Sequence, residues 1–381
     1  MARRRGGVLN ALEEAGIDFL IVTSGVNIRY LTGFTGSAGS LVVSPSEFTL
    51  VTDGRYAEQA SEEITPARAQ GPVVLEVVDS SDQSGVIASL VPRGSRVGLE
   101  APHVSWARAR TISGEWLPHC SVVPTSDLVE GIRRVKDRGE VARIAAAARI
   151  VDRALAEVAG ELVSRPTERD FALLLDRRMV DLGADGTAFE TIVASGPNAA
   201  RPHHRPSGRV IGGDGSSEGP ETVIIDVGAM VEGYRSDMTR TFLVGEGGLV
   251  GEDGLVGETG PAVGDVGEMF RTVLAANSAG VAAVRAGVTG REVDRAARDV
   301  IEDRGMGDLF VHGVGHGLGL DIHEAPMLRG HGEPLEVGEV VTVEPGVYRS
   351  GLGGVRIEDT VVVTPAGCEI LTSSPRNPNG A

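Results

Sequence analysis

Residues 223–240, with the sequence VIIDVGAMVEGYRSDMTR, constrain the fold of this chain more than any other stretch. An apolar run ends at Asp226, a Gly-containing segment follows, and a second apolar run begins just after Asp237. The pattern predicts a β-hairpin with its turn centred near Val231 and Glu232. Such a turn places Asp226 directly opposite Asp237, with both carboxylates on one face about 5 Å apart. Because adjacent carboxylates repel each other, one must keep a proton unless a bound cation neutralises the pair.

A second predicted hairpin, near the C-terminus, repeats this arrangement. An apolar strand ends at Glu344, a Gly-rich turn follows, and the returning segment reaches Glu358 before the next apolar strand. A hairpin centred on Gly351 pairs these two glutamates. His316 lies between the two hairpins, within the sequence HGVGHGLG. Four carboxylates and one imidazole suit two divalent metal ions about 4 Å apart, with Asp237 and Glu358 as bridging ligands.

The whole set of residues, rather than any single member, predicts a metal centre. Taken alone, an Asp at a strand end is usually a turn former or a cap, and a lone His more often has a structural role. Five ligand-type residues at mutually consistent hairpin spacings are much harder to explain in that way. Oxygen ligands with a single imidazole favour manganese, cobalt or iron(II) over a thiolate-type zinc site. We therefore expect two divalent ions, manganese first, with cobalt, iron or zinc as alternatives.

The chain contains, in this order, the segments VIIDVGAMVEGYRSDMTRTF, HGVGHGLGLDIHE, VVTVEPGVY and GVRIEDT. They resemble the successive signatures of the pita-bread metallopeptidases, in particular the Xaa-Pro aminopeptidases and the Xaa-Pro dipeptidases, or prolidases. The resemblance implies five metal ligands, and all are present: Asp226, Asp237, His316, Glu344 and Glu358. It also implies that three histidines line the substrate cleft, namely His203, His312 and His323. Arg356 would orient the substrate or the bridging Glu358.

Some of these residues have structural alternatives. Adjacent residues of an extended segment point to opposite faces, so at most one of His203 and His204 addresses the cleft. The family match in Pro-His gives that place to His203 and leaves His204 exposed. Glycines on both sides of His316 argue against the helical HExxH arrangement, and leave His312 beside the metals without binding them. Arg356 could instead only balance the charge of the nearby carboxylates.

Length and the alternation of predicted elements divide the chain in two. At 381 residues it is long enough for two domains. Early strands alternate with helical stretches, which indicates an α/β domain, and the segment 27–36 and TDGRY resemble a creatinase-type N-terminal domain. We expect 27–37 to form a loop. A Pro among small polar residues at 122–127 marks the boundary, so the domains are 1–125 and 126–381. The second combines paired helices with antiparallel strands, an α+β architecture.

Charge and cysteine content exclude several classes of protein. The formal net charge is −17, whereas nucleic acids and anionic membranes attract an excess of Lys and Arg. We therefore expect neither as a partner. No apolar run suits a transmembrane helix, and charges follow the N-terminal arginines too soon for a secretory signal. Two cysteines, Cys120 and Cys368, are too few for a disulfide framework, which favours the cytoplasm. The family resemblance adds an expected homodimer.

The resemblance implies hydrolysis of Xaa-Pro bonds in proline-containing peptides by a water activated between two metals, with Glu344 relaying its proton. We expect an Xaa-Pro aminopeptidase, because TGFTGSAG and TDGRY resemble compact bacterial enzymes of that type. The short connection after His323 offers only Arg329 and His331 to bind a substrate carboxylate, as a prolidase, the main alternative, would require. Methionine aminopeptidases usually lack the N-terminal domain. A metal-free creatinase or a non-catalytic binding module would be expected to lose ligands. The acidic Gly-rich segment 245–262 is expected to be a mobile surface loop rather than a lid.

Overall fold

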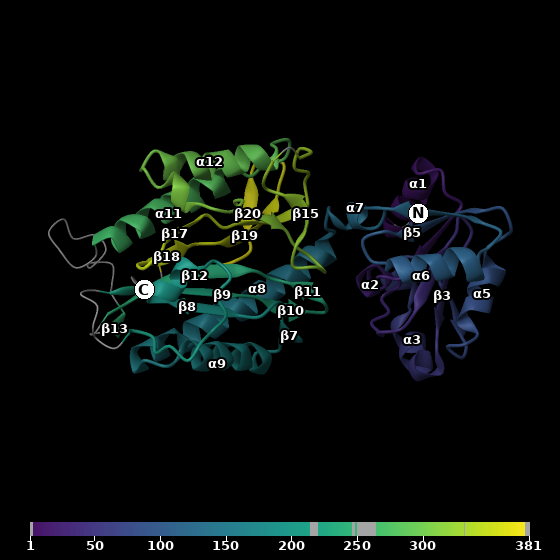
Figure 1. The fold of residues 1–381 in the computed structure, drawn as a ribbon, viewed down its shortest axis with the longest axis horizontal. Coiled ribbons are helices and arrows are strands. Elements are labelled where there is room, and N and C mark those ends of the chain that lie inside the picture. Colours follow the sequence, from purple (N-terminus) through teal and green to yellow (C-terminus); the bar gives the residue numbers. More distant parts are fainter. Residues whose placement is uncertain (1–2, 214–219, 246–247, 250–263, 331, 378–381) are drawn as a thin grey trace. The chain divides into compact units, whose positions relative to one another are not determined.

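The computed structural model describes residues 3–213, 220–245, 248–249, 264–330 and 332–377. The chain divides into two compact units, Met1–Arg133 and Arg134–Ala381 (Figure 1). The boundary predicted after residue 125 lies eight residues before this division. Within the described ranges, none of the helices is long and apolar enough to span a membrane.

The first unit is built on one six-stranded mixed sheet with the strand order β4-β3-β2-β1-β5-β6. Its strands are β1 (Phe19–Val22), β2 (Ser40–Val43), β3 (Phe48–Thr52), β4 (Val74–Val77), β5 (Arg96–Glu100) and β6 (Ser121–Thr125). Its helices are α1 (Arg3–Glu14), α2 (Gly25–Thr32), α3 (Ala57–Glu63), α4 (Pro66–Ala69), α5 (Gln83–Leu90), α6 (Trp106–Thr111) and α7 (Glu130–Arg133). Ile21, Val42 and Val97 of the sheet pack with Ile87 of α5 in one core cluster. The alternation of apolar strands with helices thus produces the expected α/β unit.

The segment predicted as a loop at 27–37 is helical in its first half, so that prediction is wrong there. α2 begins after Ser24, whose hydroxyl accepts a hydrogen bond from Asn27 N (3.5 Å), and ends at Gly33, which has a φ of 87°. The Asn27 amide is buried and donates to Glu100 Oε1 (2.7 Å). Of the glycine and hydroxyl residues that indicated a loop, Thr32 is the last residue of this helix and Gly33 is its C-cap.

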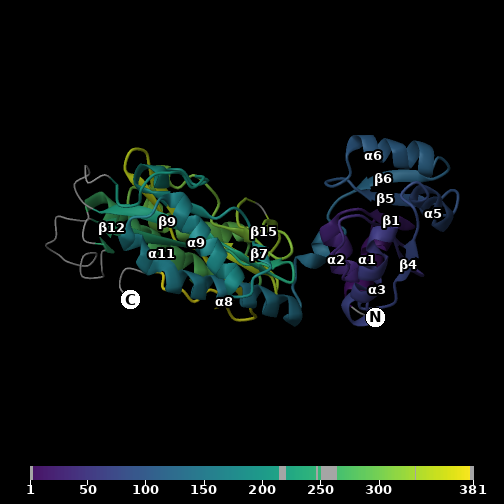
Figure 2. The ribbon, with the colours of Figure 1, turned by 90° about the horizontal axis from the view of Figure 1, so that it is seen from below.

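Two helix pairs cover the sheets of the second unit. The first pair, α8 (Arg138–Val158) and α9 (Glu168–Asp181), lies beside β9 in Figure 2. It packs on β8 (Ile192–Ser195), β9 (Glu221–Val227) and β12 (Met238–Gly245) through a core that includes Val151, Phe171 and Ile225. The predicted capped start of the second helix is confirmed, because the Thr167 hydroxyl accepts from Asp170 N (3.1 Å).

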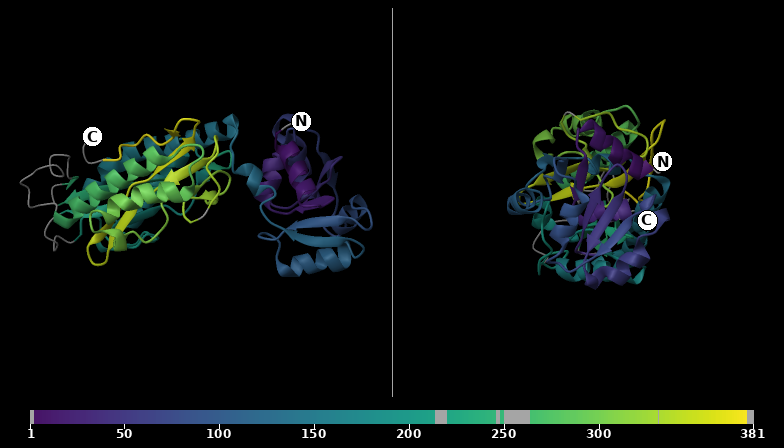
Figure 3. Two further views of the ribbon diagram at one scale, coloured as in Figure 1. Left: turned by 90° about the horizontal axis from the view of Figure 1, so that it is seen from above. Right: turned by 90° about the vertical axis from the view of Figure 1, so that its right-hand side faces the viewer.

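The second pair, α11 (Gly264–Ala283) and α12 (Gly290–Glu302), covers the C-terminal strands, drawn in yellow beside these green helices in Figure 3. Phe270, Val293 and Val341 belong to the core between them. The strands are β14 (His316–Gly317), β15 (Glu324–Met327), β16 (Val340–Val343), β17 (Gly346–Arg349), β18 (Gly353–Arg356), β19 (Asp359–Val363) and β20 (Cys368–Ile370). Each helix pair therefore packs on the strands of one of the two predicted hairpins.

The first predicted hairpin is present, but its register differs from the prediction. The turn residues are Glu232 and Gly233, with φ values of 45° and 75°, between β10 (Ala229–Val231) and β11 (Tyr234–Arg235). A two-residue turn with positive φ at both positions favours Gly at the second. This moves the turn centre by one residue, so Asp226 pairs with Thr239 rather than with Asp237. Because the shift in pairing is two residues, both aspartates keep the same face.

The second predicted hairpin has the predicted register. β16 pairs with β19, and Val343 lies opposite Asp359. β17 pairs with β18 in the same register around Gly351, with Gly346 opposite Arg356. Glu344 and Glu358 therefore face each other in the gap between the two ladders, where the hairpin passes from one sheet to the next.

The acidic Gly-rich segment 245–262 lies almost wholly outside the described residues. Two of its residues form β13 (Gly248–Leu249), which extends the sheet of β12 by pairing with its last residues. A short strand β7 (Gly186–Thr187) pairs with β10 at the other end of the first hairpin.

Candidate metal centre

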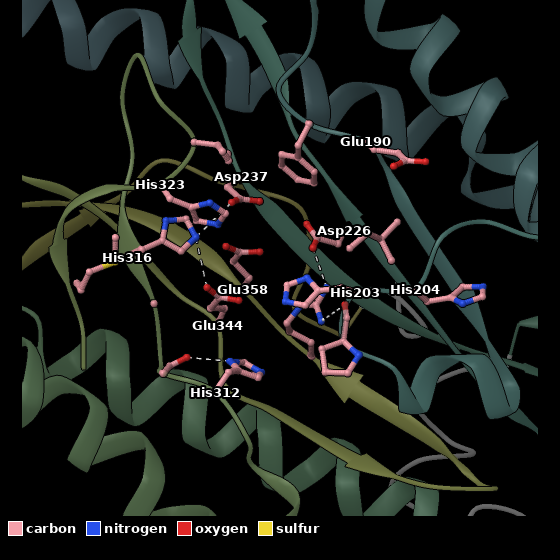
Figure 4. A pocket seen from close by; sticks show the side chains of 18 of the residues that line it. Glu190, His203, His204, Asp226, Asp237, His312, His316, His323, Glu344 and Glu358 are labelled. Atoms are coloured by element: carbon pink, nitrogen blue, oxygen red, sulfur yellow. Dashed lines mark hydrogen bonds and ion pairs between the residues drawn. The ribbon is translucent and has the colours of Figure 1, made fainter. Parts of the chain in front are cut away.

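The two hairpins and the His316 strand converge on one cavity of about 660 Å³ in the second unit (Figure 4). Its volume is in the range of sites that hold small organic ligands. All nine residues that the sequence predicted for the site line this cavity: His203, Asp226, Asp237, His312, His316, His323, Glu344, Arg356 and Glu358.

Three buried residues form the centre of the cluster. Each of Asp237, His316 and Glu358 offers a possible ligand atom, and these atoms all lie within 4.8 Å of one another. His316 Nε2 is 3.7 Å from Asp237 Oδ2 and 3.4 Å from Glu344 Oε1. In Figure 4 the side chains of Glu344 and Glu358 point toward the His316 ring from the same hairpin. The predicted convergence of both hairpins on one imidazole is thus present in the fold.

The carboxylates of this cluster cannot all be ionised without a counter-charge. Burial, together with the nearby Glu358 and Asp226 charges, raises the pKa of Asp237 well above its ordinary value. Burial and the Glu344 and Asp226 charges do the same to the pKa of Glu358. Burial raises the pKa of Glu344 to about 8, although Arg356 acts in the opposite direction. Bound divalent cations would remove this conflict.

Two buried oxygens give an independent test of the fit to cations. Within the described part of the chain, Asp226 Oδ1 and Glu358 Oε1 have no hydrogen-bond partner. Buried carboxylate oxygens are normally paired, and a divalent cation is the partner that an oxygen-rich cluster can accept. The donor set of four carboxylates and one imidazole therefore fits divalent metal ions.

The His316 ring has the protonation state that a metal ligand needs. Its Nδ1 donates to Gly317 O (3.0 Å), which leaves the Nε2 lone pair facing the carboxylates. Burial, with a smaller effect of His323, lowers the pKa of His316 to about 4, so the ring is neutral at pH 7. Its backbone N–H donates to Thr342 Oγ1 (3.1 Å). This close approach requires Gly315, where an added Cβ would lie 2.1 Å from Thr342 O.

The remaining carboxylate oxygens are oriented by hydroxyl groups and one guanidinium. Thr239 Oγ1 donates to Glu358 Oε2 (2.8 Å), and Thr342 Oγ1 to Glu344 Oε1 (3.4 Å). Arg356 Nη2 donates to Asp226 Oδ2 (2.7 Å). Such groups behind the ligands fix their orientation and influence metal affinity.

Arg356 also belongs to a hydrogen-bonded chain that the sequence analysis missed. Its Nη1 donates to the hydroxyl of Tyr348 (2.9 Å), which lies 2.9 Å from His312 Nε2. His312 Nδ1 donates to Gly313 O (2.8 Å), so Nε2 is the acceptor for Tyr348. Burial lowers the pKa of His312 to about 4 and raises that of Tyr348. The sequence does contain a pattern that indicates Tyr348. Alternate residues of a strand share a face, and Tyr348 lies four residues after Glu344.

The structure corrects the prediction for His204. Both histidines line the cavity, but His203 is exposed, whereas His204 is buried and its Nε2 lies 2.8 Å from Glu168 Oε2. The expectation that His204 is exposed is therefore wrong. The segment is also not extended, because His204 N donates to Arg201 O (3.2 Å) and closes a turn. Figure 4 shows the two neighbouring histidines directed to different places, with His203 toward Asp226.

His323 is the third predicted histidine of the cleft. Its ring centroid lies 4.3 Å from that of His316 in an edge-to-face arrangement, and its side chain is exposed to the cavity. Burial and the proximity of His203 lower its pKa, while Asp226 acts in the opposite direction. A neutral His323 ring can therefore accept or donate a hydrogen bond to a ligand beside the cluster.

The two parts of the chain match two family models. Residues 4–135 match the creatinase/prolidase N-terminal domain, and residues 142–365 match metallopeptidase family M24. The chain belongs to metallopeptidase family M24. This M24 protein is 31% identical to the Xaa-Pro dipeptidase of Pyrococcus furiosus, over 99% of both chains.

Solved structures agree with this assignment. The M24 protein is similar to the Xaa-Pro dipeptidase from Bacillus anthracis, with a TM-score of 0.86, 35% identity and 98% coverage of each chain. It is also similar to the X-Pro aminopeptidase from Thermotoga maritima MSB8, with a TM-score of 0.81, 34% identity and 98% coverage of each chain. These matches confirm the predicted family, the α+β pita-bread domain preceded by a creatinase-like domain, and a metal-dependent hydrolase.

Proposed function

We propose that this M24 metallopeptidase is an Xaa-Pro aminopeptidase, which removes the residue that precedes proline at the N-terminus of a peptide. The broader expectation of an Xaa-Pro peptidase is confirmed by the relatives, whose names state that activity. The similarity to them covers nearly the whole length of both chains. The clustering of four carboxylates and one neutral imidazole in a single cavity carries the metallopeptidase part of the proposal. The choice of an aminopeptidase rests on the resemblance of TGFTGSAG and TDGRY to compact bacterial enzymes of that type.

We assign the metal ligands to Asp226, Asp237, His316, Glu344 and Glu358. Two cations held by these five side chains, with Asp237 and Glu358 at the centre of the set, would match the number of carboxylates and the raised pKa values of this cluster. Manganese suits this oxygen-rich set, with cobalt, iron and zinc as alternatives. When bound, the cations would supply a nucleophilic water and charge stabilisation at the scissile carbonyl.

The protein's own groups would handle protons and orientation. Glu344 lies at the edge of the cluster, so its carboxylate can accept the proton of the attacking water. The proline nitrogen must gain a proton to leave, because it begins as an amide nitrogen without hydrogen. Glu344 can pass on to it the proton that it accepted from the water. His203 and His323 line the cavity where they can donate to the substrate carbonyl. The chain of Arg356, Tyr348 and His312 holds Asp226 and the cavity wall in place.

A prolidase is the second candidate, and one residue favours it. Arg329 lines the cavity, and within the described part of the chain its guanidinium has no ion pair or hydrogen bond. A free cation at this place suits the C-terminal carboxylate of an Xaa-Pro dipeptide. His331, the other predicted carboxylate partner, lies outside the described residues.

Comparative kinetics test the proposal. The metal-free protein is reloaded with manganese and assayed on Gly-Pro and on a longer peptide that begins with Gly-Pro. An aminopeptidase has the higher kcat/KM on the longer peptide, a prolidase has it on the dipeptide, and the absence of any metal-dependent cleavage would refute both. Metal analysis of the reloaded protein tests the count of two ions.

The assembly and the location in the cell are also proposals. We propose a homodimer on the strength of the family resemblance, and light scattering on the purified protein measures its mass directly. We propose a cytoplasmic location from the low cysteine content, since Cys120 and Cys368 are both free. Fractionation of the source cells tests that location.

A further inference from the structure

Glu168, the first residue of α9, is a fully buried carboxylate that the proposed chemistry does not use. It accepts hydrogen bonds from six donor groups of the last residue of β8 and of the segment that follows it. The donors are Ser195 N and Oγ (both 2.8 Å), Asn198 Nδ2 (3.0 Å), His204 Nε2 (2.8 Å), and Ser207 N and Oγ (3.0 and 2.6 Å). One side chain thus ties together residues spread over 195–207.

The charge of Glu168 determines which kind of hydrogen bond it makes with His204. Burial by itself would raise the pKa of Glu168, but the hydrogen bonds from Ser207, Asn198 and His204 outweigh burial and lower that pKa to about 2. An ionised carboxylate only accepts hydrogen bonds, so His204 Nε2 must carry the proton that it donates. The interaction therefore fixes the position of the His204 ring and keeps a proton on its Nε2.

The segment held in this way presents His203 to the catalytic cavity. Residues 201–204 form a turn closed by the hydrogen bond from His204 N to Arg201 O (3.2 Å). One side of the turn is held by Arg356 Nη1, which donates to Pro202 O (3.3 Å). The other side is held by Glu168 through His204. His203 stands between these two anchors and lines the cavity beside Asp226 (Figure 4).

We propose that Glu168 is a positioning residue, whose buried carboxylate fixes the turn at 201–204 through His204 and so directs the His203 ring into the catalytic cavity. The inference rests on the proposed Xaa-Pro peptidase function, in which His203 acts on the substrate. It assigns a task to His204, which the sequence placed on the surface.

The Glu168→Gln variant tests the proposal with little change in side-chain volume. The amide keeps one acceptor oxygen, but its NH2 group faces N–H and O–H donors, so part of the network loses its acceptor. Glu161→Gln is the matched control, because Glu161 is an exposed carboxylate seven residues earlier in the chain. His204→Ala is a second variant, which cuts the link to the turn and leaves Glu168 its other donors.

The first readout is the His203 ring signal in nitrogen NMR of metal-free protein labelled at its eight histidines. The signal is assigned by its loss in His203→Ala. We expect Glu168→Gln and His204→Ala to shift or broaden it, and Glu161→Gln to leave it in place. An unchanged His203 signal in His204→Ala would overturn the proposal, even if Glu168→Gln did not fold.

The second readout is a double-mutant cycle on the manganese-loaded protein. We expect Glu168→Gln to lower kcat by about 10-fold to 100-fold, as small misplacements of a reacting group do, with a smaller change in KM. In the His203→Ala background the same substitution should lower kcat by less than about 2-fold, because the group it positions is gone. Equal losses in both backgrounds would mean that Glu168 acts only on stability, and would overturn the proposal.

The two readouts also separate this inference from the proposed function. If the wild-type protein cleaved no Xaa-Pro peptide, the peptidase proposal would fail. The NMR comparison on metal-free protein would still decide whether Glu168 and His204 orient His203.

Discussion

Removal of the divalent cations should leave a protein that loses stability as the pH rises from 6.5 to 8. The perturbation is chelation, which leaves the clustered carboxyl groups to share protons among themselves. Burial raises the pKa of Glu344 to about 8 from an ordinary value of 4.5, and the pKa values of Asp237 and Glu358 are also raised. The folded protein therefore keeps protons that the unfolded chain releases near pH 4.5.

The sign and size of the effect follow from these values. A carboxyl group with a raised folded-state pKa contributes stability below pH 4.5 and loses it as the pH rises through 8. Each retained proton gives a slope of about −1.4 kcal/mol per pH unit, so Glu344 alone accounts for about 2 kcal/mol between pH 6.5 and 8. Below pH 6.5 the two buried histidines oppose the trend, because burial lowers the pKa values of His312 and His316 to about 4. Above pH 6.5 they are neutral in both states.

Urea unfolding followed by circular dichroism measures this slope in chelator at several pH values between 6.5 and 8. Glu344→Gln should make the slope shallower, whereas the exposed-residue control Glu369→Gln should leave it unchanged. Saturating manganese should remove the slope, because cations bind the deprotonated carboxylates. A metal-free stability that is constant or rises over this range would refute the close packing of the acidic groups.

Three further predictions test other parts of the site. Asp237→Ala should lower metal-dependent Xaa-Pro hydrolysis by at least about 10³-fold in a peptide assay, and full activity would remove the assigned mechanism. Tyr348→Phe should destabilise the protein by about 1–3 kcal/mol in urea titrations, since His312 and Arg356 lose a buried partner; unchanged stability would contradict that hydrogen-bonded chain. The prolidase alternative predicts that Arg329→Met raises KM for Gly-Pro by about 10-fold and leaves a longer Xaa-Pro peptide unaffected, and equal effects on both substrates would exclude carboxylate recognition.

The sequence predicted the site residues correctly where their position depends on the alternation of side chains along a strand. The second hairpin has the predicted register because its turn is centred on Gly351, which has a φ of 80°. In the first hairpin the predicted turn was misplaced by one position. Glu232 has a positive φ, which is uncommon for a residue other than Gly, so the sequence did not predict it. The two aspartates still share a face, because the error in pairing is an even number of residues.

The residues that sequence reasoning missed are those whose partners lie far along the chain. Glu168 and His204 are 36 residues apart, and neither belongs to a repeating pattern that would bring them together. His204 was placed on the surface because an extended segment was assumed where the chain forms a turn. Tyr348 could have been found by alternation from Glu344, but its contact with His312 depends on how the segment before β14 packs on β17.

The gap between the two ladders of the second hairpin has a consequence for how such a site can change over time. Within the gap, the main chain of Glu344 donates to Val314 O (2.7 Å), and that of Glu358 donates to Thr239 O (3.1 Å). Backbone bonds of this kind do not depend on the identity of the side chains that they carry. A descendant that exchanged its acidic groups would keep the walls of the chamber and lose only its chemistry, so this frame can be inherited by proteins that no longer cut peptides.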